Sequence, residues 1–362
     1  MLQFAVLLAA GYIVYLIAEK KINDRYLSSF RHIIHVNGIR GKTGTCRLID
    51  AALRGAGYRV FTKTTGTTPA YIGTDGTEHQ IRRRGQPNIR EQLSMIRRAH
   101  REGAEVLILE CMAVDPALQR AAQEQIVKGG LNVITNVRYD HVFAMGETLD
   151  EIAASLANTI PTGGVLFTAD EAYFDYFSTV CAQKGSRAVL CRPNEFANDE
   201  NTAIAYEVGR YLGLPDAGFR AHIAQYREDF GANKRYTVDG VPFLNLFSVN
   251  DPQSTRLILE QYTQDTGGVT FVYNHRADRP DRLQLFIRHF FSQIPCRRII
   301  VIGENRGLAC RLLRKSGLAN VEEASDCNSI FQDKDAALIV GVGNIKGAVY
   351  DMIHDLEVDS RE

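Results

Sequence analysis

A short segment at residues 37–45, Asn-Gly-Ile-Arg-Gly-Lys-Thr-Gly-Thr, has residue types and spacing suited to binding the phosphates of a nucleotide. Glycines let the backbone turn its N–H groups toward an anion, and a helix that begins directly after them adds the positive end of its dipole. The lysine can reach the terminal phosphates, and the threonine after it supplies a hydroxyl for a nucleotide-bound Mg²⁺. The predicted nucleotide-binding residues of this phosphate loop are Gly38, Arg40, Gly41, Lys42, Thr43, Gly44 and Thr45.

The phosphate loop departs from the usual eight-residue pattern, which would place a glycine where this chain has Val36. What remains is Gly-x-x-Gly-Lys-Thr between an apolar run, residues 33–36, and a helix-like segment, residues 46–56. A glycine-rich turn with a solvated lysine is the alternative. The order of strand, turn and helix favours the nucleotide site.

Polar side chains follow two apolar runs further along the chain. Glu110 closes the run 106–109, where an isolated buried carboxylate would be costly unless it paired or bound a metal. Asn136 and His141 follow the run 132–135. Because ligands bind at the carboxyl ends of parallel strands, and oxygen ligands suit Mg²⁺, these residues are expected near the phosphate loop. Taken singly, Glu110 could face water and His141 could be a hydrogen-bonding loop residue.

Short aliphatic or β-branched runs alternate with helical patterns along most of the chain, which predicts an α/β fold with a mostly parallel sheet wrapped by helices. After the phosphate loop, strands are expected at 59–62, 105–110, 132–135, 165–168 and 188–190, and helices at 90–101, 116–128, 148–159, 172–183 and 202–212. A second series is expected to have strands at 243–247, 269–273, 298–302 and 337–340, with helices from about 252, 280, 306 and 345. The boundary between the two series is expected at 229–233.

The first 18 residues carry no charge and end at Glu19-Lys20-Lys21. This length is sufficient to cross a bilayer as a helix, and the lysines follow the apolar stretch, whereas a signal peptide would begin with positive charge. The pattern predicts a membrane anchor helix at 1–21 with the rest of the chain in the cytoplasm, and so a location at the cell membrane. A buried or interfacial helix is the alternative, because Gln3, Gly11 and two tyrosines weaken the apolar pattern.

The overall charge argues against a nucleic-acid partner. Lys and Arg number 42 and Asp and Glu number 42, so the formal net charge is zero, whereas a polynucleotide-binding protein is expected to be basic. The dense basic run Arg82-Arg83-Arg84 is expected to be a solvated loop or to face a polyanion. The seven cysteines have neither metal-type nor paired spacing and are expected to be reduced.

In order and spacing, the phosphate loop, Glu110 and the segment 135–141 resemble the central ATPase domain of the Mur ligase and folylpolyglutamate synthetase superfamily. The resemblance implies ATP and Mg²⁺ as cofactors. It continues into a smaller Rossmann-like C-terminal α/β domain that closes over ATP. The residues it implies are metal ligands Thr43, Thr65, Glu110 and His141, catalytic residues Lys42, Glu110, His141 and Arg235, and nucleotide or cleft residues Asn136, Asn245 and Asn250.

Three longer strings, residues 35–43, 110–116 and 274–280, are similar to the PgsB/CapB family, the ATP-dependent subunits of bacterial poly-γ-glutamate synthases. This resemblance implies an ATP-dependent amide ligase that polymerises glutamate through γ-carboxyl linkages by way of an acyl phosphate, in capsule synthesis. The implied partners are glutamate, the growing chain and small membrane subunits of the same synthase (PgsC/CapC-like and PgsA/CapA-like); a homo-oligomer is left open. The implied substrate residues are Arg276, Arg279 and Arg282, whose guanidinium groups suit carboxylates.

The expected organisation has three parts: an anchor at 1–21, an ATP-binding central domain at 22–230 and a C-terminal domain at 231–362. Many superfamily members carry a carbamylated lysine near the position of Ser155, where this chain has no lysine. Instead of binding substrate, the three arginines at 276, 279 and 282 could form salt bridges with Asp278 and Asp281 at the start of a helix. A folylpolyglutamate-synthetase-like ligase and a membrane-tethered ATPase that regulates a partner complex remain alternative functions.

Overall fold

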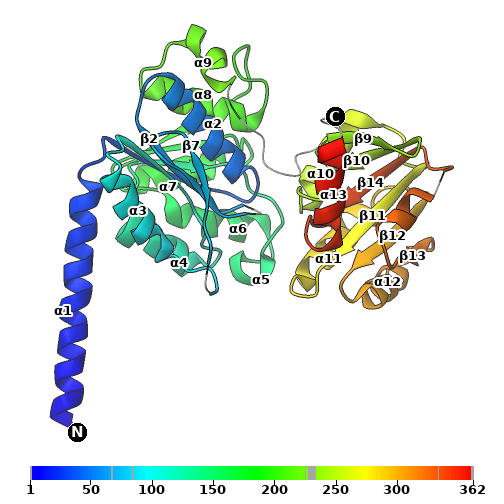
Figure 1. The fold of residues 1–362 in the computed structure, drawn as a ribbon, viewed down its shortest axis with the longest axis horizontal. Helices are drawn as coiled ribbons and strands as arrows, with labels where there is room; N and C mark the ends of the chain where they lie inside the picture. Colours follow the sequence, from blue (N-terminus) through cyan, green and yellow to red (C-terminus); the bar gives the residue numbers. More distant parts are fainter. Residues whose placement is uncertain are drawn as a thin grey trace. The chain divides into compact units, whose positions relative to one another are not determined.

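The computed structural model of the chain describes residues 2–66, 68–83, 85–224, 226, 234–332 and 334–359. The chain forms two compact units, the first made of Met1–Val137 and Ala144–Arg227 and the second of Arg138–Phe143 and Glu228–Glu362. The expected boundary at 229–233 lies outside the described residues, as does Arg84 of the basic run. Each unit is an α/β layer structure (Figure 1).

The described part of the first unit contains an eight-stranded sheet in the order β4-β3-β2-β5-β1-β6-β7-β8. The strands from β2 to β8 in this order pair in parallel, and β3 and β4 add antiparallel pairs at one edge. The strands are β1 (His32–Asn37), β2 (Val60–Thr64), β3 (Ala70–Ile72), β4 (Glu78–Gln80), β5 (Val106–Glu110), β6 (Leu131–Ile134), β7 (Val165–Thr168) and β8 (Arg187–Leu190).

Helices cover both faces of this sheet (Figure 1). Helices α2, α8 and α9 pack on one face around Ile34, Val36 and Ile108, and α3 and η1 pack on the other around Leu107 and Leu109. The helices are α2 (Lys42–Gly55), α3 (Glu91–Arg101), α4 (Pro116–Ala121), the π-helix η1 (Ala122–Val127), α5 (Val142–Met145), α6 (Leu149–Leu156), η2 (Ala157–Thr159), α7 (Phe174–Gln183), α8 (Glu200–Tyr211) and α9 (Asp216–Ile223).

The parallel strands bring their carboxyl ends to one edge of the sheet, which is the edge where α/β proteins bind ligands. Strand β1 lies between β5 and β6, with Val36 opposite Glu110 on one side and Asn37 opposite Ile134 on the other. The phosphate loop therefore leaves the sheet beside the end of β5 and the residues that follow β6. Strand β2 is the next neighbour of β5 and ends at Thr64.

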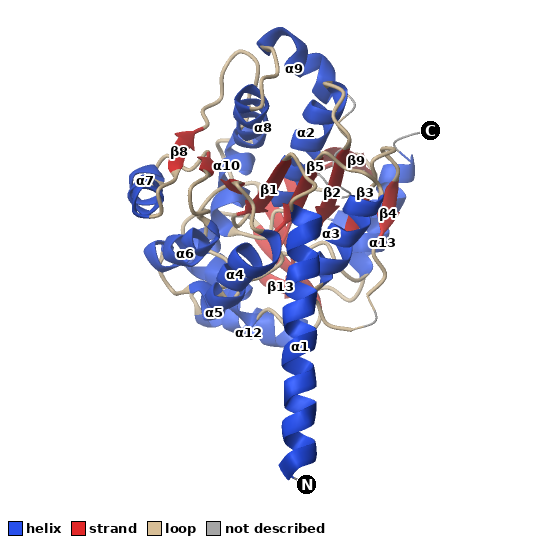
Figure 2. Cartoon of the chain, turned by 90° about the vertical axis from the view of Figure 1, so that its left-hand side faces the viewer, coloured by secondary structure: helices blue, strands red, loops and turns tan. Residues whose placement is uncertain are grey.

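The N-terminal helix α1 (Leu2–Leu27) extends from the first unit (Figures 1 and 2). Its last turns pack on that unit, where Asn23 Nδ2 donates to the Ile126 carbonyl at 2.8 Å. The apolar stretch and the charged residues after it form one continuous helix that ends at Leu27. Within the described residues, no helix meets the length and apolar character needed to cross a membrane, so the predicted membrane-spanning helix is not supported.

The described part of the second unit has a six-stranded sheet in the order β13-β12-β11-β14-β10-β9, with β9 antiparallel and the others parallel. Helices α10, α11 and α12 cover one face and α13 the other. The elements are β9 (Lys234–Val238), β10 (Val241–Asn245), α10 (Pro252–Tyr262), β11 (Val269–His275), α11 (Pro280–Phe286), η3 (Ile287–Phe291), β12 (Arg298–Gly303), α12 (Arg306–Lys315), β13 (Val321–Glu323), η4 (Asn328–Gln332), β14 (Leu338–Val342) and α13 (Ala348–Asp359).

Candidate active site

The phosphate loop connects β1 to the N-terminus of α2, and its shape depends on two glycines. Gly38 and Gly41 have φ values of 123° and 79°, which side-chain-bearing residues rarely adopt. A Cβ atom at Gly38 would also collide with the Thr135 hydroxyl. The loop leads directly into α2, a 14-residue helix whose N-terminus has the N–H groups and dipole orientation that suit an anion.

Two residues after β6 hold the middle of the phosphate loop. Asn136 Oδ1 accepts from the Arg40 backbone N–H at 3.0 Å, and Asn136 Nδ2 donates to the Arg40 carbonyl at 3.2 Å. The Thr135 hydroxyl donates to the same carbonyl at 2.6 Å. Asn136, expected near the nucleotide, thus binds both polar groups of one loop residue and fixes the loop backbone.

The Lys42 side chain curls back over the loop that precedes it. Its Nζ donates to the Gly38 carbonyl at 2.7 Å and to the Ile39 carbonyl at 3.3 Å. The ammonium group therefore lies at the loop, within reach of an anion bound to the loop amides.

Glu110 ends β5 and is 3% exposed. Three hydrogen bonds satisfy its carboxylate: Oε2 accepts from the Thr43 hydroxyl at 2.9 Å and from the Thr65 backbone N–H at 2.7 Å, and Oε1 accepts from the Thr65 hydroxyl at 2.5 Å. The structure thus brings together Thr43, Thr65 and Glu110 from three separate segments. These three residues form the carboxylate site.

The carboxylate site offers only hard oxygen donors, one carboxylate and two hydroxyls, which fits Mg²⁺ or Mn²⁺ and not a soft metal. Across the residues described, no three His, Cys, Asp or Glu side chains are grouped to hold a metal ion. The donor set therefore fits a hard divalent cation that takes its remaining ligands from water and nucleotide phosphates.

Residues outside the predicted set support the carboxylate site. Gln92 Nε2 donates to the Glu110 backbone carbonyl at 2.9 Å. The neighbouring Glu91 receives the fully buried Lys63 ammonium at 2.9 Å and the Arg83 guanidinium at 2.7 Å. Arg83, expected to be solvated or to face a polyanion, is therefore an ion-pair partner inside the first unit. The one sequence feature that pointed to Lys63 was a charged residue directly after the predicted strand 59–62, in a threonine-rich run.

Sequence reasoning also missed Asn201, near the start of α8. Its Oδ1 accepts from the Thr45 hydroxyl at 3.1 Å, and a Cβ at Gly41 would collide with its amide group. Asp199 caps α8 by accepting from the backbone N–H groups of residues 201 and 202, which fixes the helix start. The cap is visible in the sequence, but the direction of the Asn201 side chain is not.

His141 lies in Arg138–Phe143, the segment that belongs to the second unit. It has a left-handed backbone with φ 53°, and its N–H donates to Asp140 Oδ1 at 2.8 Å. In the same unit, Arg235 is exposed on β9. Asn245 is buried at the end of β10 with Oδ1 accepting from the Phe247 N–H at 3.2 Å, and Asn250 has φ 65° and Oδ1 accepting from Arg282.

The three predicted substrate arginines all have carboxylate partners within the second unit. Arg276 pairs with Asp278 at 2.5 Å, and Arg279 pairs with Asp281 at 3.2 Å and also with Asp140. Arg282 is buried and lies 3.5 Å from Asp140. These ion pairs match the alternative left open by the sequence, in which the arginines form salt bridges at the start of a helix.

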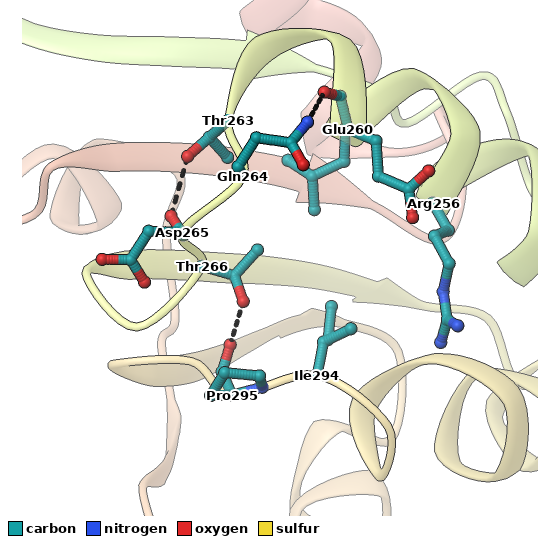
Figure 3. A pocket seen from close by; sticks show the side chains of 9 residues that line it. Arg256, Glu260, Thr263, Gln264, Asp265, Thr266, Ile294 and Pro295 are labelled. Carbon is teal, nitrogen blue, oxygen red and sulfur yellow. Dashed lines mark hydrogen bonds between the residues drawn. The ribbon is translucent and has the colours of Figure 1, made fainter.

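The second unit also has a cavity of about 230 Å³ at the end of α10, lined by residues of α10, 263–266 and 294–295 (Figure 3). None of the predicted site residues lines it. Its hydrogen bonds, such as that from the Thr266 hydroxyl to the Pro295 carbonyl at 2.6 Å, join its own walls.

Residues 36–216 match the family model of the Mur ligase middle domain, and residues 234–359 match that of the poly-gamma-glutamate synthase CapB C-terminal domain. The chain is 31% identical to the capsule biosynthesis protein CapB of Bacillus anthracis, over 97% of this chain and 82% of that protein. It is 30% identical to the PGA synthase CapB of Bacillus subtilis strain 168, over 98% of this chain and 97% of that protein. The chain belongs to the CapB family of poly-γ-glutamate synthases.

The family resemblance predicted from the sequence is therefore confirmed. The fold of this CapB-family chain is also similar to that of the bifunctional folylpolyglutamate synthase/dihydrofolate synthase of Yersinia pestis, solved with AMPPNP and Mn ion. The TM-score is 0.68 at 16% identity, covering 97% of this chain and 98% of that one. This likeness confirms the predicted α/β fold with mostly parallel sheets.

Proposed function

We propose that this chain activates the γ-carboxylate of glutamate with ATP and joins it to the amino group of another glutamate. The observation that carries the proposal is the carboxylate site beside the phosphate loop, with Thr43 bonded to Glu110 at 2.9 Å, in a chain of the CapB family. An ATP-dependent ligase that polymerises glutamate is the activity predicted from the sequence, and the family assignment confirms it.

The reaction needs activation because a carboxylate is a poor acyl donor. Its oxygen attacks the terminal phosphorus of ATP, the bond to the bridging oxygen breaks, and ADP leaves. The incoming amine then attacks the acyl phosphate and displaces inorganic phosphate. The loop N–H groups and Lys42 would stabilise the charge on the moving phosphoryl group, which is mostly positioning and electrostatics.

Mg²⁺ is the proposed metal, because the donor set is oxygen only. Thr43, Glu110 and Thr65 would hold it, with His141 as a further ligand from the segment 138–143. A bound divalent cation supplies Lewis-acid stabilisation of the phosphate oxygens. The hydroxyls of Thr43 and Thr65 already face Glu110 and so orient its carboxylate.

The second unit is proposed to complete the site when ATP binds. Its Arg235 is exposed and would contact phosphate or ribose, and its Asn245 and Asn250, with Asn136 of the first unit, would shape the nucleotide pocket. Of the three predicted substrate arginines, Arg276 is the most exposed, with 24% of its side chain accessible. We propose that Arg276 exchanges its ion-pair partner Asp278 for a glutamate carboxylate. Arg279 and Arg282 would instead stabilise the structure of the second unit.

Assembly with small membrane subunits of the same synthase, and a place at the cell membrane, remain predictions that rest on the family resemblance. Fractionation tests them. The full chain is expected with the membranes when those subunits are co-expressed, and recovery in the soluble fraction under the same conditions would contradict the prediction.

The proposed activity is tested with membranes that contain the full chain and its partner subunits. ADP release is expected to depend on glutamate, and hydroxylamine is expected to trap the activated acyl group. Lys42→Ala is expected to abolish both while the chain stays folded. ADP release that ignores glutamate would favour the regulatory ATPase instead.

A further inference from the structure

A fully buried cation lies behind the carboxylate site. Lys63 is on β2, opposite Leu109 of β5, and its side chain is 0% exposed. Glu110 is the next residue of β5, and Thr65, two residues after Lys63, donates to both oxygens of Glu110. Lys63 is therefore one register position away from Glu110, whose carboxylate attracts the ammonium group electrostatically.

The charges around Lys63 balance without any bound ion. Lys63 Nζ is 2.9 Å from Glu91 Oε1, and Arg83 donates to both Glu91 oxygens at 2.7 and 3.0 Å. Burial lowers the pKa of Lys63, and the Glu91 carboxylate opposes that shift. Glu110 is a second carboxylate that attracts both cations, so these four side chains together carry no net formal charge. A divalent cation added at Glu110 would leave this buried group with an excess positive charge.

We propose that Lys63 is a fixed counter-cation that makes divalent-metal binding at Glu110 conditional on nucleotide. It acts through Glu110 and is a positioning and specificity residue, not a catalytic one. Without nucleotide, the repulsion between Lys63 and the metal opposes binding to a site that offers one carboxylate. The negative phosphates of ATP offset that repulsion, so that metal enters together with nucleotide. The inference rests on the metal site of the proposed function.

The Lys63 charge can be removed without leaving the Glu91 carboxylate unpaired. Lys63→Met keeps an unbranched side chain of similar length, and Glu91 retains both hydrogen bonds from Arg83. Lys63→Gln is a second variant that also removes the charge, and Lys63→Arg keeps it. Lys184→Met is the matched control: Lys184 is another partly buried lysine of the first unit, its pKa is also lowered by burial, and its Nζ donates to the Ile160 carbonyl at 2.9 Å.

The test is a titration of the full chain with Mn²⁺, with and without AMPPNP. The paramagnetic resonance signal of the free ion measures how much Mn²⁺ is bound. Circular dichroism checks that each variant is folded. Without nucleotide, Lys63→Met and Lys63→Gln are expected to bind Mn²⁺ about tenfold tighter than wild type or more, and Lys63→Arg and Lys184→Met are expected to match wild type. With AMPPNP, the difference is expected to shrink to about threefold or less.

Nucleotide-free affinity that is unchanged or weaker in both neutral variants would overturn the proposal while leaving the metal site intact. Absence of Mn²⁺ binding to wild type even with AMPPNP would instead remove the metal site of the proposed function, and the inference with it.

Discussion

The Thr43 hydroxyl donates a 2.9 Å hydrogen bond to Glu110 Oε2, joining two residues that are 67 positions apart in the chain. Thr43 lies in the first turn of α2 and Glu110 at the end of β5, so the bond connects the phosphate loop to the neighbouring strand. A metal held by both residues would lie directly beside phosphates bound to the loop.

Glu110→Gln is expected to reduce glutamate-dependent ADP release by on the order of 100-fold. The amide lacks the charge that a divalent cation needs, and its NH₂ group cannot accept from the Thr43 and Thr65 donors. Steady-state ADP release measures the loss. Glu105→Gln, just before the same strand and partly exposed, is the matched control and should keep wild-type turnover. Equal losses in both variants would count against a specific role for Glu110.

Asn136→Ala is expected to weaken AMPPNP binding by about tenfold, because the loop backbone at Arg40 loses two hydrogen bonds from one amide group. Equilibrium binding of AMPPNP to the full chain measures it. Asn158→Ala removes a partly exposed amide that accepts a hydrogen bond from Arg120, and it should leave affinity unchanged. Wild-type affinity for AMPPNP in Asn136→Ala would show that the phosphate loop keeps its conformation without the Asn136 hydrogen bonds.

Gly38→Ala is expected to lower the free energy of unfolding by about 2 kcal/mol or more, since it combines a φ of 123° with a collision against Thr135. Gly57 also has a positive φ, 90°, but there is open space around its Cβ position. Gly57→Ala therefore measures the cost of the backbone conformation without a steric collision. Urea unfolding of both variants gives the comparison. A smaller loss in Gly38→Ala than in Gly57→Ala would contradict the close approach.

His35 predicts a pH dependence of stability. It is fully buried on β1, its Nδ1 lies 2.9 Å from Gln123 Oε1, and burial lowers its pKa from 6.5 to about 4. Between these values the unfolded chain binds the proton and the folded chain does not, so stability falls as pH falls from about 6.5 to about 4, by about 3 kcal/mol in total.

Urea midpoints measured across this pH range test the His35 prediction. His35→Asn is expected to flatten the slope, and His79→Asn, at an exposed position on β4, should leave it as in wild type. An identical slope in His35→Asn and wild type would assign the pH dependence to other groups.

The positions of the main elements could be predicted because their sequence patterns are local. The strand at 165–168 matches β7, and helices predicted to start near 252, 280 and 306 begin at residues 252, 280 and 306. The predicted helix 116–128 begins at Pro116 behind an Asp115 cap but changes to a π-helix at Ala122. The short strands β3, β4 and β13 were missed, because three residues give too little periodicity.

The site was only partly predictable, because the missing features depend on pairing between distant residues. The sequence predicted Glu110 at the end of a strand and Thr43 in the phosphate loop, and the family resemblance implied Thr65; the sheet order brings the three together. It did not reveal that Lys63 is buried against Glu91, because that requires β2 to be an inner strand covered by α3. Nor did it reveal that Asp140 pairs with Arg279 and Arg282.

Transfer of a phosphoryl group to the substrate carboxylate is the central claim, and an isotope measurement tests it most directly. Glutamate labelled with ¹⁸O in its γ-carboxylate is supplied with ATP to membranes that contain the chain and its partner subunits. If an acyl phosphate forms, each inorganic phosphate released during polymerisation carries one ¹⁸O from glutamate, and Glu110→Gln releases little of it. Polymer synthesis with unlabelled phosphate would contradict the account.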